Sequence, residues 1–482
     1  MENDITSFDA TELANLIRTK QISPVEVMQA HLELVEKINP KVNALVTLSD
    51  DSLEKARKSE IELLKGNISG PLHGVPFTVK DCFDTEGILT TRGSKLFCDN
   101  IPTKNATAVN RMLNAGAIVI GKSNMPEFAL WWETGNLIFG TTNNPWDLAR
   151  TPGGSSGGSA AALAAGLTGL EAGSDIGGSI RNPAHFCGIY GHKPTWGIVS
   201  DKGHDLPGTY MPADIAVVGP MGRSAEDLAL SMDIVAGPGR TDRRGWQLAL
   251  NKPSNTKLSD FKIAILSNHI MAPVSNEMAN RVQSIADTLA KLGAIVSDVA
   301  LPNIDFEACF ETYNSLLWGV MGAATPEEEK EKMREISKNR AEEHSISIDM
   351  ARFTIQEHGE WLTYSNDRFR LRNEWDSFFK EWDILICPQM PTDAFPHDHG
   401  GYLERTLTVN NEDQDYFQQV FWAGIITVAH LPSTVFPTGP SKAGLPIGLQ
   451  AVGAEYNDLI TIDFARLLAQ EIGGFTPPPN YP

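Results

Sequence analysis

The sequence has few cysteines and no excess of positive charge. Its 482 residues include 5 cysteines, which are scattered and form no CxxC pair. This excludes a disulfide framework and a zinc ribbon, and it is typical of a reducing compartment. Lys and Arg number 40 against 60 for Asp and Glu, so the net charge is −20. Because nucleic-acid-binding proteins normally present a basic face, the charge argues against a nucleic-acid partner and against an anionic membrane.

Long apolar runs are also missing. The sequence has no stretch of about 18 apolar residues that could span a membrane. Residues 1–10 are acidic and lack the apolar region of a signal peptide. We therefore expect a cytoplasmic protein. Hydrophobic residues make up 41% of the chain, which is enough for a large core and excludes disorder as the dominant state.

The hydrophobic pattern predicts a helical N-terminus followed by α/β structure. Residues 1–65 carry apolar residues at helical spacing, with Ser23 as an N-cap before Pro24. Residues 66–250 alternate short β-branched runs with glycine-rich turns and an Ala-rich helix. This alternation is typical of an α/β fold.

A second α/β half is expected over residues 251–482. It contains a strand–helix–strand unit at about 261–299. A helical insertion is expected at about 301–400, whose charged residues 326–345 predict a solvated helix. Because no flexible linker separates the halves, we expect a single domain over residues 1–482.

The strongest signal of chemistry is a pair of serines in glycine-rich turns. Ser155 and Ser179 each precede a helix-prone segment. Glycine lets a substrate approach the backbone closely, and the free N–H groups of a helix start suit an oxyanion. Gly177-Gly178-Ser179 therefore predicts a nucleophile beside its own oxyanion hole.

Residues 153–157 also match G-x-S-x-G, the nucleophile elbow of α/β-hydrolases. That motif requires a strand directly before it. The preceding residues are typical of a loop, so we do not expect an elbow at Ser155.

The group that activates the serine is a lysine or a histidine. Lys80 ends an apolar run, and burial there would lower its pKa and make it a base; an ordinary interaction with Asp81 is the alternative. His185 is expected one turn along the helix after Ser179, where packing is its expected role. His397 and His399 could be taken for metal ligands, but adjacent ligands in a Pro/Gly loop rarely close a tetrahedral site, so we expect no metal and no cofactor.

These residues belong to a longer pattern. The sequence resembles the amidase signature family over most of the chain, with little of the pattern in residues 301–400. The matching segments are GPLHGVPFTVKD at 70–81, GKSNMPEF at 121–128, NPW at 144–146, PGGSSGGS at 152–159, GSDIGGSIR at 173–181, GIYGHKPT at 188–195 and GLPIGLQ at 444–450.

The resemblance implies a fold and a mechanism. The fold would be one α/β/α sandwich around a mixed, mostly parallel sheet. Ser179 would be the nucleophile, Lys80 the base, and Ser155 the bridging serine after a cis peptide bond with Gly154. The backbone N–H groups of Ile176, Gly177, Gly178 and Ser179 would hold the oxyanion, with Gly154 also at the substrate. The spacing of 24 residues between the serines fits the family pattern.

Two functions within the family compete. The first is a stand-alone hydrolase of amides, with esters, anilides or aryl carbamates as further substrates. The second is the amidase subunit of a glutamine-dependent aminoacyl-tRNA amidotransferase. The sequence departs from the subunit pattern at residues 187–199. It also departs at Ile176, where the subunit type commonly has Thr. Both departures favour the hydrolase. A catalytically dead binding protein is disfavoured because all three triad positions are filled. A homodimer stays open at this point.

Trp131 and Trp132 are expected at the substrate. Adjacent residues on a strand cannot both face one core, so at least one should line the pocket. The pair predicts an apolar or aromatic small-molecule amide substrate. We expect the two tryptophans to govern substrate choice and to leave the chemistry unchanged.

Overall fold

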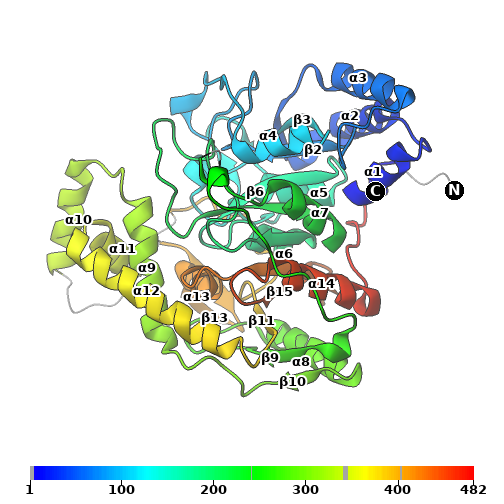
Figure 1. Ribbon diagram of the computed structural model, residues 1–482. Helices are drawn as coiled ribbons and strands as arrows, with labels where there is room; N and C mark the ends of the chain where they lie inside the picture. Colours follow the sequence, from blue (N-terminus) through cyan, green and yellow to red (C-terminus); the bar gives the residue numbers. More distant parts are fainter. Residues whose placement is uncertain (1–4, 240, 340–345, 402–403, 482) are drawn as a thin grey trace.

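The fold is built on one sheet that runs through both halves of the chain. The computed structural model describes residues 5–239, 241–339, 346–401 and 404–481. The sheet has 11 strands, with helices on both of its faces (Figure 1). In sheet order the strands are β1 (Leu45–Leu48), β3 (Ile118–Ser123), β2 (Pro76–Lys80), β6 (Leu170–Asp175), β8 (Val217–Gly222), β7 (Tyr190–Lys193), β14 (Ser433–Pro440), β15 (Pro446–Val452), β11 (Ile384–Pro388), β9 (Lys262–Ile265) and β10 (Ile295–Ser297).

The sheet is mixed, as predicted. Among the strands described, β2 pairs parallel with β3 and β6, and β9 pairs parallel with β10 and β11. The other neighbours pair antiparallel. The expectation that parallel pairs predominate is therefore wrong. Part of the cause is the short turn between β14 and β15, because a short connection can join only antiparallel strands.

The N-terminal helices form where the pattern predicts them. They are α1 (Ala10–Arg18), α2 (Pro24–Val42) and α3 (Ser52–Lys65). Ser23 caps α2 by accepting from Glu26 N at 3.0 Å, while the Glu26 carboxylate accepts from Ser23 N at 2.8 Å. This reciprocal capping box satisfies N–H groups that a helix start leaves free. Sequence analysis missed β1, which interrupts the helical region and lies at the edge of the sheet.

The central strands are buried on both faces. Every residue of β2, β3, β6 and β8 is buried, which is typical of strands covered by helices on both sides. Of the covering helices, α5 (Gly157–Ala164) contacts β2, β3, β6 and β8, and α7 (Ala225–Val235) contacts β8. The helices α6 (Arg181–Cys187) and α14 (Asp458–Ile472) pack on β14 and β15, and α4 (Thr107–Asn114) packs on α7. The predicted strand–helix–strand unit is confirmed as β9, α8 (Asn276–Lys291) and β10.

The predicted insertion is helical and forms a layer beside the sheet (Figure 1). It comprises α9 (Phe306–Met321), α10 (Glu327–Asn339), α11 (Ile346–Thr354) and α12 (His358–Phe378). The helix α13 (Phe421–Thr427) lies against α9. The charged segment is helical as α10, and residues 340–345 lie outside the described residues.

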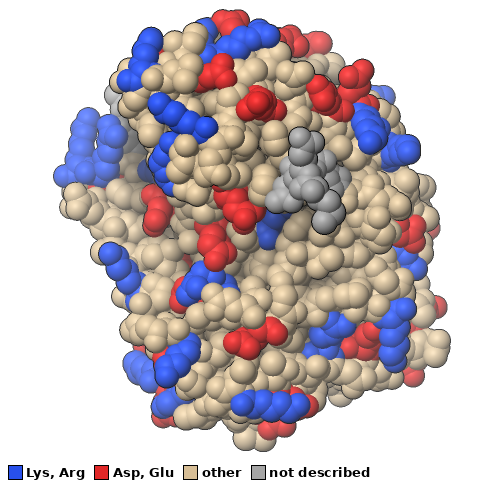
Figure 2. All heavy atoms as spheres, turned by 90° about the vertical axis from the view of Figure 1, so that its right-hand side faces the viewer, with Lys and Arg blue, Asp and Glu red and all other residues tan. Residues whose placement is uncertain are grey.

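The surface in Figure 2 carries interspersed basic and acidic side chains, and neither sign gathers into one dominant patch on that face. Among the described residues, no helix combines the length and the apolar character that a membrane span requires.

Candidate active site

Lys80 lies at the centre of the predicted site. It is the last residue of β2 and is fully buried. Its Nζ lies 2.7 Å from Ser155 Oγ and 3.1 Å from Ser174 Oγ. Asp81 instead accepts hydrogen bonds from Thr91. The structure therefore pairs the lysine with the predicted bridging serine and not with its neighbour in the chain.

The two glycine-rich turns lie side by side. Ser179 follows β6 and precedes α6, and Ser156 N donates to the Ser179 carbonyl at 3.1 Å. The Gly154–Ser155 peptide bond is cis. The residues directly before Ser155 are irregular, so the turn lacks the strand that a hydrolase elbow requires.

Burial sets the protonation of the groups around Lys80. It lowers the pKa of Lys80 because a charged ammonium loses its hydration there, although nearby acidic groups oppose the shift. Burial also raises the pKa of Glu171 to about 8. The Glu171 carboxyl accepts hydrogen bonds from Thr78 and Ser123. Both shifts favour the uncharged form of the group, and the uncharged form of a lysine is the one that can take a proton from a hydroxyl group.

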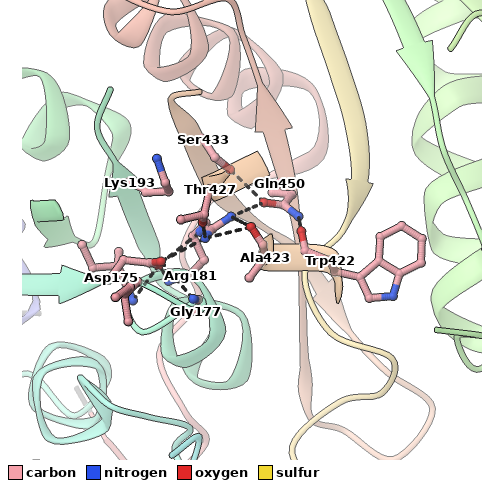
Figure 3. A network of polar contacts seen from close by, with 12 residues as sticks. Asp175, Gly177, Arg181, Lys193, Trp422, Ala423, Thr427, Ser433 and Gln450 are labelled. Carbon is pink, nitrogen blue, oxygen red and sulfur yellow. Dashed lines mark hydrogen bonds and ion pairs between the residues drawn. The ribbon is translucent and has the colours of Figure 1, made fainter. Parts of the chain in front are cut away.

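A buried ion pair holds the turn that carries Ser179 (Figure 3). Arg181 Nη2 lies 2.9 Å from Asp175 Oδ1, and both side chains are fully buried. Burial alone would raise the pKa of Asp175, but the Arg181 guanidinium lowers it to about 2. Arg181 also donates to Thr427 at 2.8 Å and to Gln450 at 3.2 Å. The pair thus ties the Ser179 turn to α13 and β15.

Two aromatic side chains orient the peptide groups before Ser179. Tyr313 donates its hydroxyl hydrogen to the Ile176 carbonyl at 3.1 Å, and Trp132 Nε1 donates to the Gly177 carbonyl at 2.7 Å. The Gly178 N–H donates to Asp175 Oδ1 at 2.9 Å. That group is already engaged, which corrects the expectation that Gly178 supplies an oxyanion donor.

A narrow cavity of about 50 Å³ opens at Ser179. Both tryptophans of the predicted pair line it, together with one face of α9. Gly154, which was expected at the substrate, is not among the lining residues. A Cβ at this position would lie 2.7 Å from the Trp131 carbonyl oxygen, so glycine lets these two chain segments approach each other closely. The lining residues are Ala129, Leu130, Trp131, Trp132, Ile176, Gly177, Ser179, Asn314, Leu317, Trp318, Met321, Phe417 and Val420.

The histidines have structural partners. His185 accepts from Gly448 N at 2.7 Å and contacts the Thr392 carbonyl at 2.9 Å. His192 contacts Thr434 and Asp458. The hydrogen bonds recorded for these side chains among the described residues go to groups other than Ser179. Of the two histidines weighed as metal ligands, His397 contacts the Asn143 amide oxygen, and its ring stacks on that of His399.

Sequence analysis missed Ser174, Tyr313 and Phe417. Ser174 contacts Lys80 and lies inside the glycine-rich motif, directly before Asp175. Its place in that motif could have identified it as a site residue. Tyr313 and Phe417 lie outside the family motifs, and periodicity shows only that such residues are buried. Tyr313 reaches the Ile176 carbonyl, and Phe417 lines the cavity, because of how α9 and the segment before α13 pack against the Ser179 turn.

Comparison with known proteins agrees with the motifs. The family model described as Amidase matches residues 26–461. The chain belongs to the amidase signature family. It is an amidase-family hydrolase acting on C–N bonds.

The names of the relatives of this amidase indicate different functions. It is 31% identical to a component of the glutamyl-tRNA(Gln) amidotransferase of Caldanaerobacter subterraneus subsp. tengcongensis, over 94% of each chain. A bacterial aryl acylamidase structure has 25% identity and a TM-score of 0.81 over 96% of each chain. A solved inhibitor-bound structure, described as a vestigial protein complex that reveals the evolutionary origins of an s-triazine catabolic enzyme, has 28% identity and a TM-score of 0.81, with 98% of this chain and 100% of that chain covered.

Proposed function

We propose that this amidase hydrolyses uncharged linear amides with an apolar or aromatic group, through an acyl-enzyme on Ser179. The observation that carries the proposal is the lining of the cavity at Ser179. Among the described residues that line it, none has a charged side chain, and Trp131, Trp132, Trp318 and Phe417 supply flat apolar walls. Such a slot suits a flat aromatic acyl or amine group.

The contacts of Lys80 support a proton relay. Neutral Lys80 takes the hydroxyl proton of Ser155, and Ser155 takes that of Ser179 as Ser179 Oγ attacks the amide carbonyl. The oxyanion accepts from the backbone N–H groups of Ile176, Gly177 and Ser179. As the C–N bond breaks, the proton returns through the relay to the leaving amine. Water then attacks the acyl-enzyme with the same relay and releases the acid.

The alternative function is glutaminase activity as the amidase subunit of a glutamine-dependent aminoacyl-tRNA amidotransferase. The names of relatives such as the Caldanaerobacter protein favour it. A glutamine substrate, however, carries an α-ammonium and an α-carboxylate. In the described cavity neither charge would find a charged partner, and burying an unpaired charge costs several kcal/mol. The lining therefore favours the stand-alone hydrolase.

A substrate panel tests this proposal. The purified single chain is given anilides, primary amides, aryl esters, aryl carbamates and glutamine, with Ser179→Ala as the control. We expect turnover of aromatic anilides or amides, and of some esters and aryl carbamates, without any other protein present. Turnover of glutamine alone, and only after partner subunits are added, would reverse the choice.

A further inference from the structure

The wall that α9 contributes to the Ser179 cavity is a single stripe of that helix. Asn314, Leu317, Trp318 and Met321 line the cavity at three- and four-residue spacing, so they share one face of α9. Asn314 is the polar exception in this stripe. Among the described lining residues, Asn314 and Ser179 are the two whose side chains offer a strong hydrogen-bond acceptor.

The side-chain amide of Asn314 is buried without a protein partner. Asn314 is 6% exposed, and within the described residues its amide makes no hydrogen bond. Unlike the enclosed Nε1 of Trp318, this amide keeps accessible surface, and the residue lines the cavity. Buried amides are normally paired, because an unpaired one costs stability. An unpaired amide that opens into a cavity can be paired by a substrate that enters it.

Asn314 lies at the end of the stripe that is close to the reacting serine. The preceding residue, Tyr313, donates to the Ile176 carbonyl at 3.1 Å. This turn of α9 therefore packs on the chain directly before Ser179. The other end of the stripe, at Met321, lies about 10 Å further along the helix axis. The polar group of the stripe is thus beside the place where the scissile amide must lie.

An amide substrate needs an acceptor at this place. Its carbonyl oxygen meets the proposed oxyanion donors, which leaves its N–H to be paired. The two peptide carbonyls before the nucleophile already accept from Tyr313 and Trp132, and Ser179 Oγ is the attacking atom. Among the described lining side chains, Asn314 Oδ1 is then the acceptor that remains. An ester has no N–H and gains nothing from it.

We propose that Asn314 sets a preference of this amidase for amides that carry an N–H over esters, because its Oδ1 accepts a hydrogen bond from the N–H of the scissile amide. A site that pairs a substrate N–H discriminates against the analogue that lacks it. The preferred substrates are therefore primary and secondary amides. The assignment rests on the proposed hydrolysis at Ser179.

Two substrates of the same shape test the assignment. Acetanilide and phenyl acetate differ at one position, where the amide has an N–H and the ester an oxygen. Asn314→Leu replaces the side-chain amide with an apolar group of similar size. We expect this variant to lower the ratio of kcat/KM for acetanilide to kcat/KM for phenyl acetate about 5- to 150-fold. The intrinsic reactivities of the two substrates cancel, because the ratio is compared between variants.

Met321→Leu is the matched control. It changes the same stripe of the cavity and removes no strong hydrogen-bonding group, so the ratio should stay within about threefold of the wild type. Urea unfolding gives a second readout. Because the Asn314 amide makes no hydrogen bond within the described residues, Asn314→Leu should be no less stable than the wild type.

Two results would overturn the assignment and leave the proposed function in place. One is an unchanged ratio in Asn314→Leu while both substrates are still turned over. The other is a loss of stability in Asn314→Leu, which would give the amide a structural partner. Failure of the wild type to turn over either substrate is a different result, because it would overturn the proposed function and the assignment with it.

Discussion

The replacement Trp132→Phe separates the two roles that the structure gives to Trp132. The indole lines the cavity, and its N–H donates to the Gly177 carbonyl at 2.7 Å. Phenylalanine keeps much of the apolar wall and removes the donor. The Gly177–Gly178 peptide is held at its other end by Asp175, so the replacement frees one of its two anchors. The sequence alone suggested that the tryptophans leave the chemistry unchanged; the hydrogen bond revises this expectation for Trp132.

The size of the effect follows from the lost hydrogen bond. A buried carbonyl without its partner costs about 1–3 kcal/mol. If the aligned peptide matters in the transition state, kcat falls by about 5- to 150-fold. Trp318→Phe is the matched control. Trp318 lines the same cavity, and its Nε1 has no hydrogen-bond partner within the described residues.

The assay compares a large aromatic amide with acetamide in both variants. We expect Trp132→Phe to lower kcat for both substrates, because the peptide it orients serves any substrate. Trp318→Phe should leave the kcat for acetamide within about threefold of wild type, since it removes no recorded hydrogen bond. Equal kcat values in the two variants, with both proteins folded, would refute the role of the Trp132 hydrogen bond.

Three further predictions concern Lys80, Asp175 and Trp131. Lys80→Ala should lower kcat by about 10²–10⁴-fold. In the wild type, kcat/KM should rise with pH through an apparent pKa below the free-lysine value of about 10.4, because burial lowers the pKa of Lys80. An acidic limb of the pH profile at the free-lysine value would point to another base. Asp175→Asn leaves Arg181 buried without its partner, so urea unfolding should show a loss of about 3–5 kcal/mol. The pKa of Asp175 is depressed to about 2, so the difference in unfolding free energy between the wild type and Asp175→Asn should be largest above a pH of about 4 and should shrink as the pH falls towards 2. A difference that does not change with pH would contradict the ion-pair account. Trp131→Ala should lower kcat/KM for large aromatic amides far more than for acetamide, and equal losses would make Trp131 a core residue.

Local signals in the sequence predicted much of the site. Lys80 ends an apolar run, and glycines surround Ser155 and Ser179, so burial and turn geometry could be inferred without the fold. Their meeting in space came only from the family resemblance. The structure places Lys80 Nζ 2.7 Å from Ser155 Oγ, and it joins the two serine turns through the bond of 3.1 Å from Ser156 N to the Ser179 carbonyl.

The features of the fold and the site that the sequence did not predict depend on long-range packing. Tyr313 lies 137 residues from the carbonyl that it holds, and helical periodicity cannot name such a partner. The balance of parallel and antiparallel pairs was also mispredicted, because strand runs reveal their burial but not their neighbours. The engaged Gly178 N–H could not be foreseen either, since it depends on how the Asp175 carboxylate turns towards Arg181.

Covalent labelling of the wild type with a fluorophosphonate, followed by peptide mass spectrometry, tests the central claim most directly. Ser179 lines the cavity at the end of the proposed relay, so the account predicts one adduct on Ser179 and parallel loss of amidase activity. The Ser179→Ala variant should remain folded, take up no label and lose turnover. An adduct on Ser155 or Ser156, or turnover in Ser179→Ala above a few per cent of wild type, would contradict the account.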